Sequence, residues 1–421
     1  MLGVIADDLT GATDAACMIA RRGLSVTQVI GPPSGAPQGD ADAIVVALKS
    51  RSVPSAEAVA CSLATLDWLE ASGAEQIYFK YCSTFDSTPD GNIGPVAAAL
   101  ATRLDQTTTI FCPGFPENGR TVYRGHIFVD DRLISESSLA THPLNPMTDP
   151  DLVRFLRLQS GKTQVRSLSL EDIEAGPDRV RNILLASTEQ GGGFLLADTL
   201  FDRHIEILAE ALVDARLVTG GSPLCGALAG RRAIGGEHAK SRIAPVPQDG
   251  PPAILAGSCS QASRNQIDRI AQHHAVQRLD PLALASQEAH LEETIEAASQ
   301  NILAGKPAIV ASSADPEAVA AAQNRLGADR AGEIIETALG DIARALASLG
   351  TRVFVVAGGE TSSAVARALE VDRLEIGPEI TPGVPWTRSL GEPQYRLAFK
   401  SGNFGGPDFF MEALDGQRRA S

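Results

Sequence analysis

The stretch "GVIADDLTGATDAA", residues 3–16, is the part of the sequence that sets the fold class. A short apolar run, Val4-Ile5-Ala6, ends at two adjacent acids, Asp7 and Asp8, and an alanine-rich segment of helical character follows. A strand that leads through a polar turn into a helix is the repeating unit of parallel α/β folds. The stretch therefore predicts an α/β protein that begins with such a unit.

The same unit recurs along the first half of the chain. Short β-rich runs at 4–6, 43–48, 77–80 and 109–112 alternate with helical stretches at 12–22, 57–71 and 93–104. This alternation predicts a mainly parallel sheet with helices on both faces. Ligands of such sheets bind at the carboxyl ends of the strands, so the residues after each strand are the candidates for a site.

A proline-rich segment interrupts the alternation. Residues 238–252, "HAKSRIAPVPQDGPP", contain four prolines among polar residues and read as a linker between domains. Strand signals resume at 253–256, 307–312 and 352–357. We expect two α/β domains, 1–237 and 253–421, with an active site in the cleft between them that closes about the linker.

Composition excludes several classes of protein. The 421 residues carry 36 basic and 51 acidic side chains, a net charge of −15, which argues against a partner such as nucleic acid or an anionic membrane. We expect no targeting segment, because Met1 leads directly into a strand, and no membrane span. The six cysteines form no CxxC pair, so free thiols in a cytoplasmic protein are expected. No histidine spacing indicates a zinc site. The sequence is compatible with a homo-oligomer.

The acid pair Asp7-Asp8 has three possible interpretations. Acids at the start of a helix cap it and interact favourably with its dipole, which needs no further function. Alternatively, two carboxylates at the carboxyl edge of a sheet can hold the hydroxyls of a polyol, take a proton, or hold Mg²⁺ through water. A phosphatase with an aspartyl nucleophile would place its acids two residues apart, and Leu9 at that position weakens this third reading.

Other polar residues follow the next strands. Arg51, in "ALKSRS" (47–52), can grip a carboxylate with two hydrogen bonds, although loop arginines are often only solvated. Hydroxyls and an acid surround one lysine in "IYFKYCSTFDST" (77–88), a density that suits a small hydroxylated anion, although such residues also form turns. The candidates for binding this anion are Asp7, Asp8, Arg51, Lys80, Ser83, Thr84, Asp86 and, in the loop 112–129, Arg120.

The second half carries three candidate phosphate-binding segments. "ILAGSCSQAS" (254–263) and "VFVVAGGETSSAVARAL" (353–369) each read as strand, glycine and helix, and "FKSGNFGGPDFF" (399–410) is a glycine-rich loop. Glycines let backbone N–H groups approach phosphate oxygens. One such turn is commonplace, but three in one domain favour a nucleotide. By contrast, the Gly-Lys-Thr at 161–163 lacks both the preceding strand and the earlier glycine of a P-loop, so we reject that reading.

These motifs together resemble the four-carbon acid sugar kinases, a family of two-domain ATP-dependent enzymes. The resemblance runs in order over essentially the whole chain, through "GVIADDLTGATD", "KSRS", "IYFKYCSTFDST", "GNIGPV", "CPGFPENGRTVYRGHIFV", "HPLNPMTDPDLV", "AGSCS", "AGGETS" and "KSGNFGG". The segment "VDDRLISESS" (129–138) departs from the family pattern, because a glycine is expected where Asp130 or Ser138 stands.

The resemblance implies a reaction and a set of roles. ATP and Mg²⁺ would be the cofactors, and the γ-phosphoryl group would pass to the 4-hydroxyl of a four-carbon sugar acid. "KYCSTFDST" with "GNIGPV" is most similar to the branch that acts on 3-oxo-tetronate. On this basis our hypothesis is that Arg51 and Lys80 hold the carboxylate and oxo group, that Asp8, Ser83, Thr84 and Asp86 hold hydroxyls, and that Asp8 orients or deprotonates the attacking oxygen. Matching ATP-binding positions are Ser258, Gly358, Gly359, Glu360, Thr361, Gly402 and Asn403.

Three alternatives stay open at this point. A D-threonate or D-erythronate 4-kinase of the same family would share every motif except the residues after Lys80. A non-catalytic, ATP-responsive sugar-acid sensor would bind the same ligands without forming ADP. A phosphatase would release phosphate without ATP and would have no use for the glycine segments of the second half.

Overall fold

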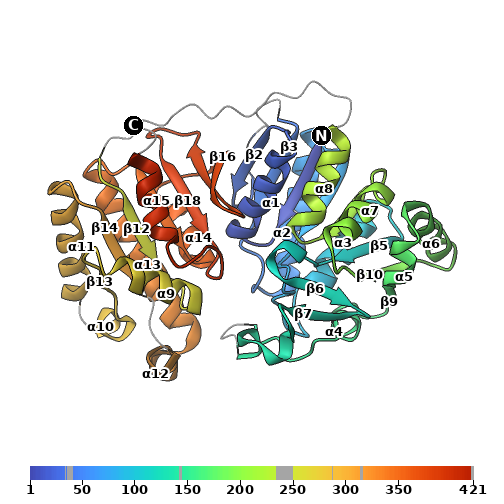
Figure 1. The fold of residues 1–421 in the computed structure, drawn as a ribbon, viewed down its shortest axis with the longest axis horizontal. Helices are drawn as coiled ribbons and strands as arrows, with labels where there is room; N and C mark the ends of the chain where they lie inside the picture. The colour runs from blue at the N-terminus through green and yellow to red at the C-terminus, as the bar shows by residue number, and fades with distance from the viewer. Residues whose placement is uncertain are drawn as a thin grey trace. The chain divides into compact units, whose positions relative to one another are not determined.

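A computed structural model describes residues 1–33, 35, 41–141, 145–233, 250–286, 288–312 and 316–418 (Figure 1). The chain divides into two compact units, Met1–Ser241 and Arg242–Ser421, which are described separately below. Most of the predicted linker, residues 238–249, lies outside the described residues. Within the described part, no helix combines the length and apolarity needed to cross a membrane.

The first unit is built on a parallel sheet whose strand order is β2-β3-β1-β4-β11-β5-β10-β9. Each neighbouring pair in this order is parallel. The strands are β1 (Leu2–Ala6), β2 (Val26–Ile30), β3 (Ala43–Ala47), β4 (Gln76–Lys80), β5 (Thr108–Cys112), β9 (Val165–Leu168), β10 (Gly193–Ala197) and β11 (Leu217–Gly220).

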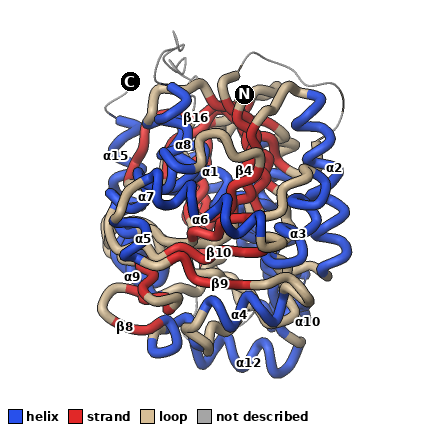
Figure 2. The backbone as a smooth tube through the Cα atoms, turned by 90° about the vertical axis from the view of Figure 1, so that its right-hand side faces the viewer, coloured by secondary structure: helices blue, strands red, loops and turns tan. Residues whose placement is uncertain are grey.

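Helices cover this sheet in two rows (Figure 2). In one row α1 (Leu9–Arg21) packs on α8 (Ser222–Ala233), followed by α7 (Asp202–Ala211) and α6 (Pro177–Glu189). In the other, α2 (Ser55–Ala71), α3 (Ile93–Arg103) and α4 (Leu152–Gln159) pack in turn. The short helix α5 (Leu170–Glu174) contacts α6 and α7, and a small antiparallel sheet contains β6 (Arg120–Tyr123), β7 (His126–Val129) and β8 (Arg132–Leu133).

The central strands are buried along their whole length, because helices cover both faces. All five residues of β1, β3, β4 and β5 are buried, as the apolar sequences of β1 and β3 predict. In β4 and β5 this burial includes the polar residues Gln76, Lys80, Thr108 and Thr109. The predicted strands at 4–6, 43–48, 77–80 and 109–112 correspond to β1, β3, β4 and β5. The strands β2, β9, β10 and β11, which complete the sheet, were not predicted from the sequence.

The second unit has a mixed sheet of order β13-β14-β12-β15-β18-β17-β16. The first five strands are parallel, and β17 runs antiparallel to both β18 and β16. The strands are β12 (Ala253–Ala256), β13 (Gln277–Arg278), β14 (Ala308–Ala311), β15 (Val353–Ala357), β16 (Arg373–Thr381), β17 (Val384–Ser389) and β18 (Arg396–Lys400). The helices are α9 (Gln261–Ile270), α10 (Pro281–Ser286), α11 (Glu288–Leu303), α12 (Pro316–Leu326), α13 (Ala328–Ser348), α14 (Gly359–Ala368) and α15 (Phe409–Arg418).

Each unit has its own hydrophobic core. In the first unit, Phe111 on β5 is fully buried and its ring lies 4.7 Å from that of Phe194 and 5.9 Å from that of Tyr81. In the second unit, the apolar side chains of the parallel strands pack with Phe409 and Phe410 of α15. The six cysteines are free thiols, as expected from their spacing.

Truncation of Phe111 tests the packing of the first core. Phe111→Ala removes a fully buried ring, so it should lower the free energy of unfolding by about 3–5 kcal/mol, measured by urea denaturation. Leu158→Ala is the control, because this leucine of α4 is 60% exposed and its loss should cost less than about 0.5 kcal/mol. Equal effects of the two substitutions would contradict this description of the core.

Candidate active site

The acid pair of the opening stretch lies where β1 ends and α1 begins. Asp8 caps α1: its carboxylate accepts hydrogen bonds from the backbone N–H of Gly11 (3.0 Å) and the hydroxyl of Thr10 (2.6 Å). The capping interpretation is therefore correct for Asp8. Asp8 has a further contact beyond the cap, because one of its oxygens also accepts a hydrogen bond from Arg51.

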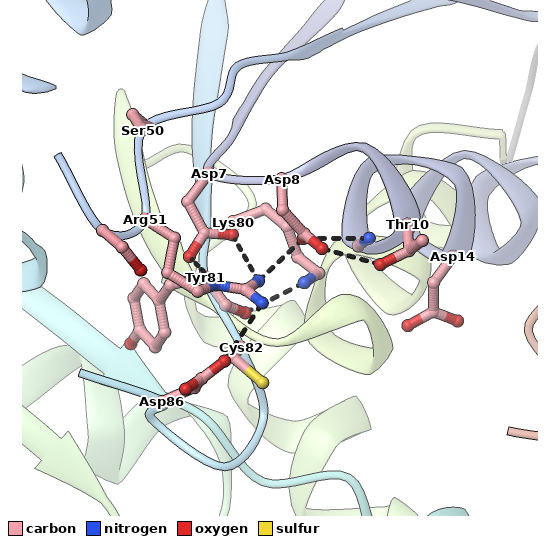
Figure 3. Close-up of polar contacts among 12 residues, drawn as sticks. Asp7, Asp8, Thr10, Asp14, Ser50, Arg51, Lys80, Tyr81, Cys82 and Asp86 are labelled. Atoms are coloured by element: carbon pink, nitrogen blue, oxygen red, sulfur yellow. Dashed lines mark hydrogen bonds and ion pairs between the residues drawn. The ribbon is translucent and has the colours of Figure 1, made fainter. Parts of the chain in front are cut away.

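Arg51 joins three carboxylates (Figure 3). Its Nε and Nη2 atoms donate to both oxygens of Asp7, each at 2.8 Å, which is the bidentate arrangement that guanidinium groups favour. Nη2 also donates to Asp8 Oδ1 at 2.7 Å, and Nη1 donates to Asp86 Oδ2 at 3.2 Å. Two turns that are far apart in the sequence thus meet at one arginine. We call Asp7, Asp8, Arg51 and Asp86 the carboxylate cluster.

Burial and the neighbouring positive charges shift the pKa values of Asp7 and Asp8 in opposite directions. Burial raises the pKa of Asp7 above its ordinary value, although the charge of Arg51 opposes this effect. Burial acts in the same way on Asp8, but the charges of Arg51 and Lys80 and the hydrogen bonds from Thr10 and Gly11 outweigh it and hold the pKa of Asp8 below its ordinary value. Asp8 is therefore a persistent anion, which makes it a good hydrogen-bond acceptor and a weak base.

Lys80 ends β4 beside this cluster. The residue is only 3% exposed, and its ammonium group donates to the backbone carbonyl of Tyr81 at 3.0 Å. The helix α1 approaches it closely: a Cβ atom at Gly11 would lie 2.6 Å from Lys80 Nζ and 2.4 Å from Asp8 Oδ1. Only glycine leaves this space open. The space is bounded by an ammonium group, a carboxylate and a helix N-terminus, which are groups that bind a hydroxylated anion.

The loop after β4 turns Asp86 back toward Arg51. Phe85 adopts the left-handed backbone region (φ 62°), which costs free energy for a non-glycine residue. Its fully buried ring packs against Tyr81 (5.4 Å) and Phe155 (6.0 Å), which offsets that cost. Of the other residues predicted here, Thr84 is buried and contacts the thiol of Cys82 (3.1 Å), whereas Ser83 is half-buried.

Arg120 does not join the carboxylate cluster through any described contact. It lies on β6, and its buried Nε atom has no hydrogen-bond partner among the described residues. The hairpin of β6 and β7 is held by Asp198, whose buried carboxylate accepts from the backbone N–H groups of Arg124 (2.8 Å) and Gly125 (3.0 Å).

Two asparagines that sequence reasoning did not identify support the cluster. Asn92 Nδ2 donates to the carbonyls of Ser50 (2.6 Å), Arg51 (3.2 Å) and Val53 (2.9 Å), and so fixes the loop that carries Arg51. Asn145 Nδ2 donates to Asp86 Oδ1 at 3.1 Å. The position of Asn92 just before α3 suggests a helix cap, but its side chain makes no capping hydrogen bond.

A second helix N-terminus also lies at this edge of the sheet. Gly220 ends β11 opposite Lys80 of β4, and Gly221 and Ser222 lead into α8. The hydroxyl of Ser222 donates to the buried Asp14 of α1, so the start of α8 is tied to the second turn of α1. The sequence "VTGGSPL" (218–224) has the same strand–glycine–helix pattern as the segments singled out in the second half, and this signal could have identified it.

In the second unit, the three predicted phosphate-binding segments converge. A Cβ atom at Gly257 would lie 1.9 Å from Thr361 Oγ1, and one at Gly402 would lie 2.4 Å from Ser258 Oγ. Gly358, with φ 117°, would place a Cβ atom 3.2 Å from the backbone nitrogen of Ser258. Glu360 lies in the first turn of α14, and Asn403 follows Gly402 in the loop after β18.

The glycines at this meeting point keep the space free of side chains. Backbone N–H groups can therefore approach a ligand, and the N-termini of α9 and α14 add positive potential, so the residues present fit a nucleotide phosphate. For metals, the described residues contain no group of three or more His, Cys, Asp or Glu side chains that could hold an ion.

The lowered pKa of Asp8 has a consequence for stability. A carboxylate whose pKa is lower in the folded than in the unfolded state stabilises the fold above the unfolded value, 3.8 here, and this contribution is lost as the pH falls through the folded value. Asp8→Asn should therefore lower the free energy of unfolding at pH 6 by roughly 1–3 kcal/mol. The difference from wild type should shrink below pH 3.8 in a series of urea denaturation curves.

Asp67→Asn is the matched control, because Asp67 is 62% exposed in its ion pair with Arg103. This substitution should change the free energy of unfolding little at any pH. An Asp8→Asn effect that is the same at pH 6 and pH 3 would show that the charge of Asp8 is not responsible.

Comparisons with known proteins match both units. A family model described as a sugar-binding N-terminal domain matches residues 2–228, and one described as a nucleotide-binding C-terminal domain matches residues 253–410. Three relatives named 3-oxo-tetronate kinase come from Cupriavidus necator (48% identical, 98% of this chain and 96% of the relative), Pseudomonas fluorescens (49%, 98% and 96%) and Salmonella typhimurium (42%, 98% and 98%).

Two solved structures share the fold over nearly the whole chain. One is from Salmonella typhimurium LT2 and bears the name of a tRNA synthase; it has a TM-score of 0.85 at 40% identity and covers 99% of both chains. The other, from Haemophilus influenzae, has a TM-score of 0.76 at 39% identity and covers 98% of this chain and 99% of its own. By both domain models and its full-length relatives, the chain belongs to the two-domain family of four-carbon acid sugar kinases that includes the 3-oxo-tetronate kinases.

Proposed function

We propose that this protein is an ATP-dependent kinase that transfers the γ-phosphoryl group to the 4-hydroxyl of 3-oxo-tetronate. The observation that carries the proposal is the convergence of Gly257-Ser258, Gly358–Thr361 and Gly402-Asn403 in the second unit. A phosphatase with the acid pair of the first unit has no use for these segments. The names of the full-length relatives support 3-oxo-tetronate as the acceptor.

The residues of the first unit have separate roles in this proposal. Lys80 binds the substrate carboxylate or oxo group, because its buried ammonium group has N–H donors beyond the one directed at Tyr81. Arg51 keeps the three carboxylates together and has one N–H left on Nη1 for the substrate. Substrate hydroxyls are held by the carboxylate cluster together with Ser83 and Thr84, and Arg120 is a further contact for the anion.

Asp8 orients the attacking hydroxyl by accepting its hydrogen bond. The low pKa of Asp8 favours this role over proton abstraction. Phosphoryl transfer has a loose transition state, so orientation and charge neutralisation supply most of the catalysis and a strong base is not required. The reaction also requires the acceptor hydroxyl to reach the γ-phosphorus, so we propose that the sugar-acid and nucleotide sites meet during turnover.

Phosphates are held by the backbone N–H groups of the three converging segments. Mg²⁺ would neutralise charge on the phosphate oxygens when bound, and such ions are usually held by phosphates, water and one or two carboxylates. Glu360, in the first turn of α14, is the carboxylate that fits this role, because Asp408 of the third segment is paired with Arg269.

Release of ADP with MgATP tests the proposed function directly. The panel contains both enantiomers of 3-oxo-tetronate, D- and L-threonate and D-erythronate. We expect ADP and a 4-phosphate product, identified by phosphorus NMR, with a 3-oxo-tetronate. Turnover with threonate or erythronate alone would show that the protein is a kinase with a different acceptor. Binding of ATP and sugar acid without ADP would contradict the kinase and favour the sensor, and phosphate release without ATP would favour the phosphatase.

Two glycine substitutions should separate the two sites. Gly11→Ala places a methyl group against Lys80 and Asp8, so it should raise the KM for the sugar acid by about tenfold or more and leave the Kd for ATP unchanged. Gly257→Ala places a methyl group against Thr361 and should weaken ATP binding instead. Gly391→Ala is the control, because nothing lies within 4 Å of its added Cβ atom. Identical kinetic effects of Gly11→Ala and Gly257→Ala would contradict the assignment of separate sites.

A further inference from the structure

Lys400, the last residue of β18, is a buried cation inside the second unit. It is 0% exposed, and its Nζ atom donates to Ser263 Oγ (3.2 Å), the carbonyl of Ser401 (3.0 Å) and the carbonyl of Gly402 (2.9 Å). Three acceptors match the three N–H groups of an ammonium ion. Burial opposes the charge and lowers the pKa of Lys400 to about 7. Because the side chain is fully buried, it is unsuited to direct contact with a nucleotide.

The two carbonyls that Lys400 contacts are consecutive in the chain. The carbonyl of Gly402 also accepts hydrogen bonds from Ser260 Oγ (2.7 Å) and Ser263 Oγ (3.0 Å), and the carbonyl of Ser401 accepts one from the N–H of Phe404 (3.1 Å). Both carbonyls therefore point toward the interior, where the ammonium group and the start of α9 hold them.

This direction determines where the adjoining N–H groups point. In a planar trans peptide the C=O and the following N–H point in opposite directions. With the carbonyls of Ser401 and Gly402 turned inward, the N–H groups of Gly402 and Asn403 are turned away from Lys400. Neither N–H group has a hydrogen-bond acceptor within the described ranges of the chain. Consecutive N–H groups that point the same way form a concave site for an anionic oxygen.

We propose that Lys400 is a positioning residue of the phosphate-binding site: by holding the carbonyls of Ser401 and Gly402 inward, it turns the N–H groups of Gly402 and Asn403 toward a phosphate of the nucleotide. This inference rests on the proposed function, because it needs a nucleotide in the second unit. Ser258, whose hydroxyl would lie 2.4 Å from a Cβ atom at Gly402, places the strand–helix turn after β12 at the same point. The charge of Lys400 acts through the backbone, without contact with the ligand.

The test compares Lys400→Met with a matched substitution in the same loop. Gln266 is 1% exposed, and its Nε2 atom donates to the carbonyls of Phe404 (3.1 Å), Gly405 (3.0 Å) and Gly406 (3.0 Å). Gln266→Met therefore removes three hydrogen bonds from the loop without freeing the carbonyls of Ser401 and Gly402. The Kd for ADP is measured by calorimetry on the full-length chain, with urea denaturation in parallel and with KM and kcat for both substrates.

We expect Lys400→Met to raise the Kd for ADP and the KM for ATP by about tenfold or more, while the KM for the sugar acid stays unchanged. Gln266→Met should change the Kd for ADP by less than about threefold, even if it lowers the free energy of unfolding more than Lys400→Met does. If Lys400→Met does not fold, Ser263→Ala removes one donor to the Gly402 carbonyl and one acceptor from Lys400, and should weaken ADP binding in the same direction.

Three results would overturn the inference. They are an unchanged Kd for ADP in Lys400→Met, an unchanged Kd in a folded Ser263→Ala when Lys400→Met does not fold, and equal losses of affinity in Lys400→Met and Gln266→Met. The last would show that general loosening of the loop is responsible. A wild-type protein that binds neither ATP nor ADP would overturn the proposed function together with this inference. Nucleotide binding by wild type with an unaffected Lys400→Met variant would overturn the inference alone.

Discussion

The guanidinium group of Arg51 is the interaction on which the arrangement of the first unit depends. Three carboxylates at one edge of a sheet repel each other, and burial of each one adds a cost in free energy. Arg51 offsets both effects because its planar fork reaches Asp7, Asp8 and Asp86 at once. Asn92 holds the loop of Arg51, and the packing of Phe85 turns Asp86 toward it, so backbone and core both serve this contact.

This balance leaves a chemically useful asymmetry. The carboxylate cluster together with Lys80 contains three carboxylates and two cations, an excess of one negative charge when every acid is ionised. The acids also differ in character: burial dominates at Asp7 and raises its pKa, whereas the surrounding cations and hydrogen bonds dominate at Asp8 and lower its pKa. A ligand at this edge therefore meets fixed acceptors for its hydroxyls and a separate cation for its anionic group. These are the requirements of a small polyhydroxy acid.

Local sequence patterns revealed the candidates that lie directly after strands, and missed those that act over long distances in the chain. Asp7 and Asp8 follow β1, Arg51 lies in the loop after β3, and Lys80 ends β4, so the alternation alone could identify them. Asn92 and Asn145 lie 42 and 59 residues from the groups they contact, so no periodicity could identify them. In the second unit the three glycine segments could be predicted, but the contacts of Lys400 inside the unit could not, because its partner Ser263 lies 137 residues away in the sequence. The strands β9, β10 and β11 were not predicted, although α5, α6 and α7 separate them in the same alternation. The small β6–β8 sheet and the loops around it interrupt the pattern between β5 and β9.

The loop between β4 and α3 is anchored at both sides of Ser83. Thr84 and Phe85 are buried on one side and Lys80 and Tyr81 on the other, whereas Ser83 is half-buried and makes no side-chain hydrogen bond with the described residues. Because the neighbours of Ser83 fix the backbone and the Ser83 side chain contributes no hydrogen bond within the described part of the chain, a substitution here should change the free energy of unfolding little. Under the proposed function, in which Ser83 contacts the sugar acid, a substitution at this position can alter acceptor preference without a loss of stability, and Ser83 is a natural first position for a selection library.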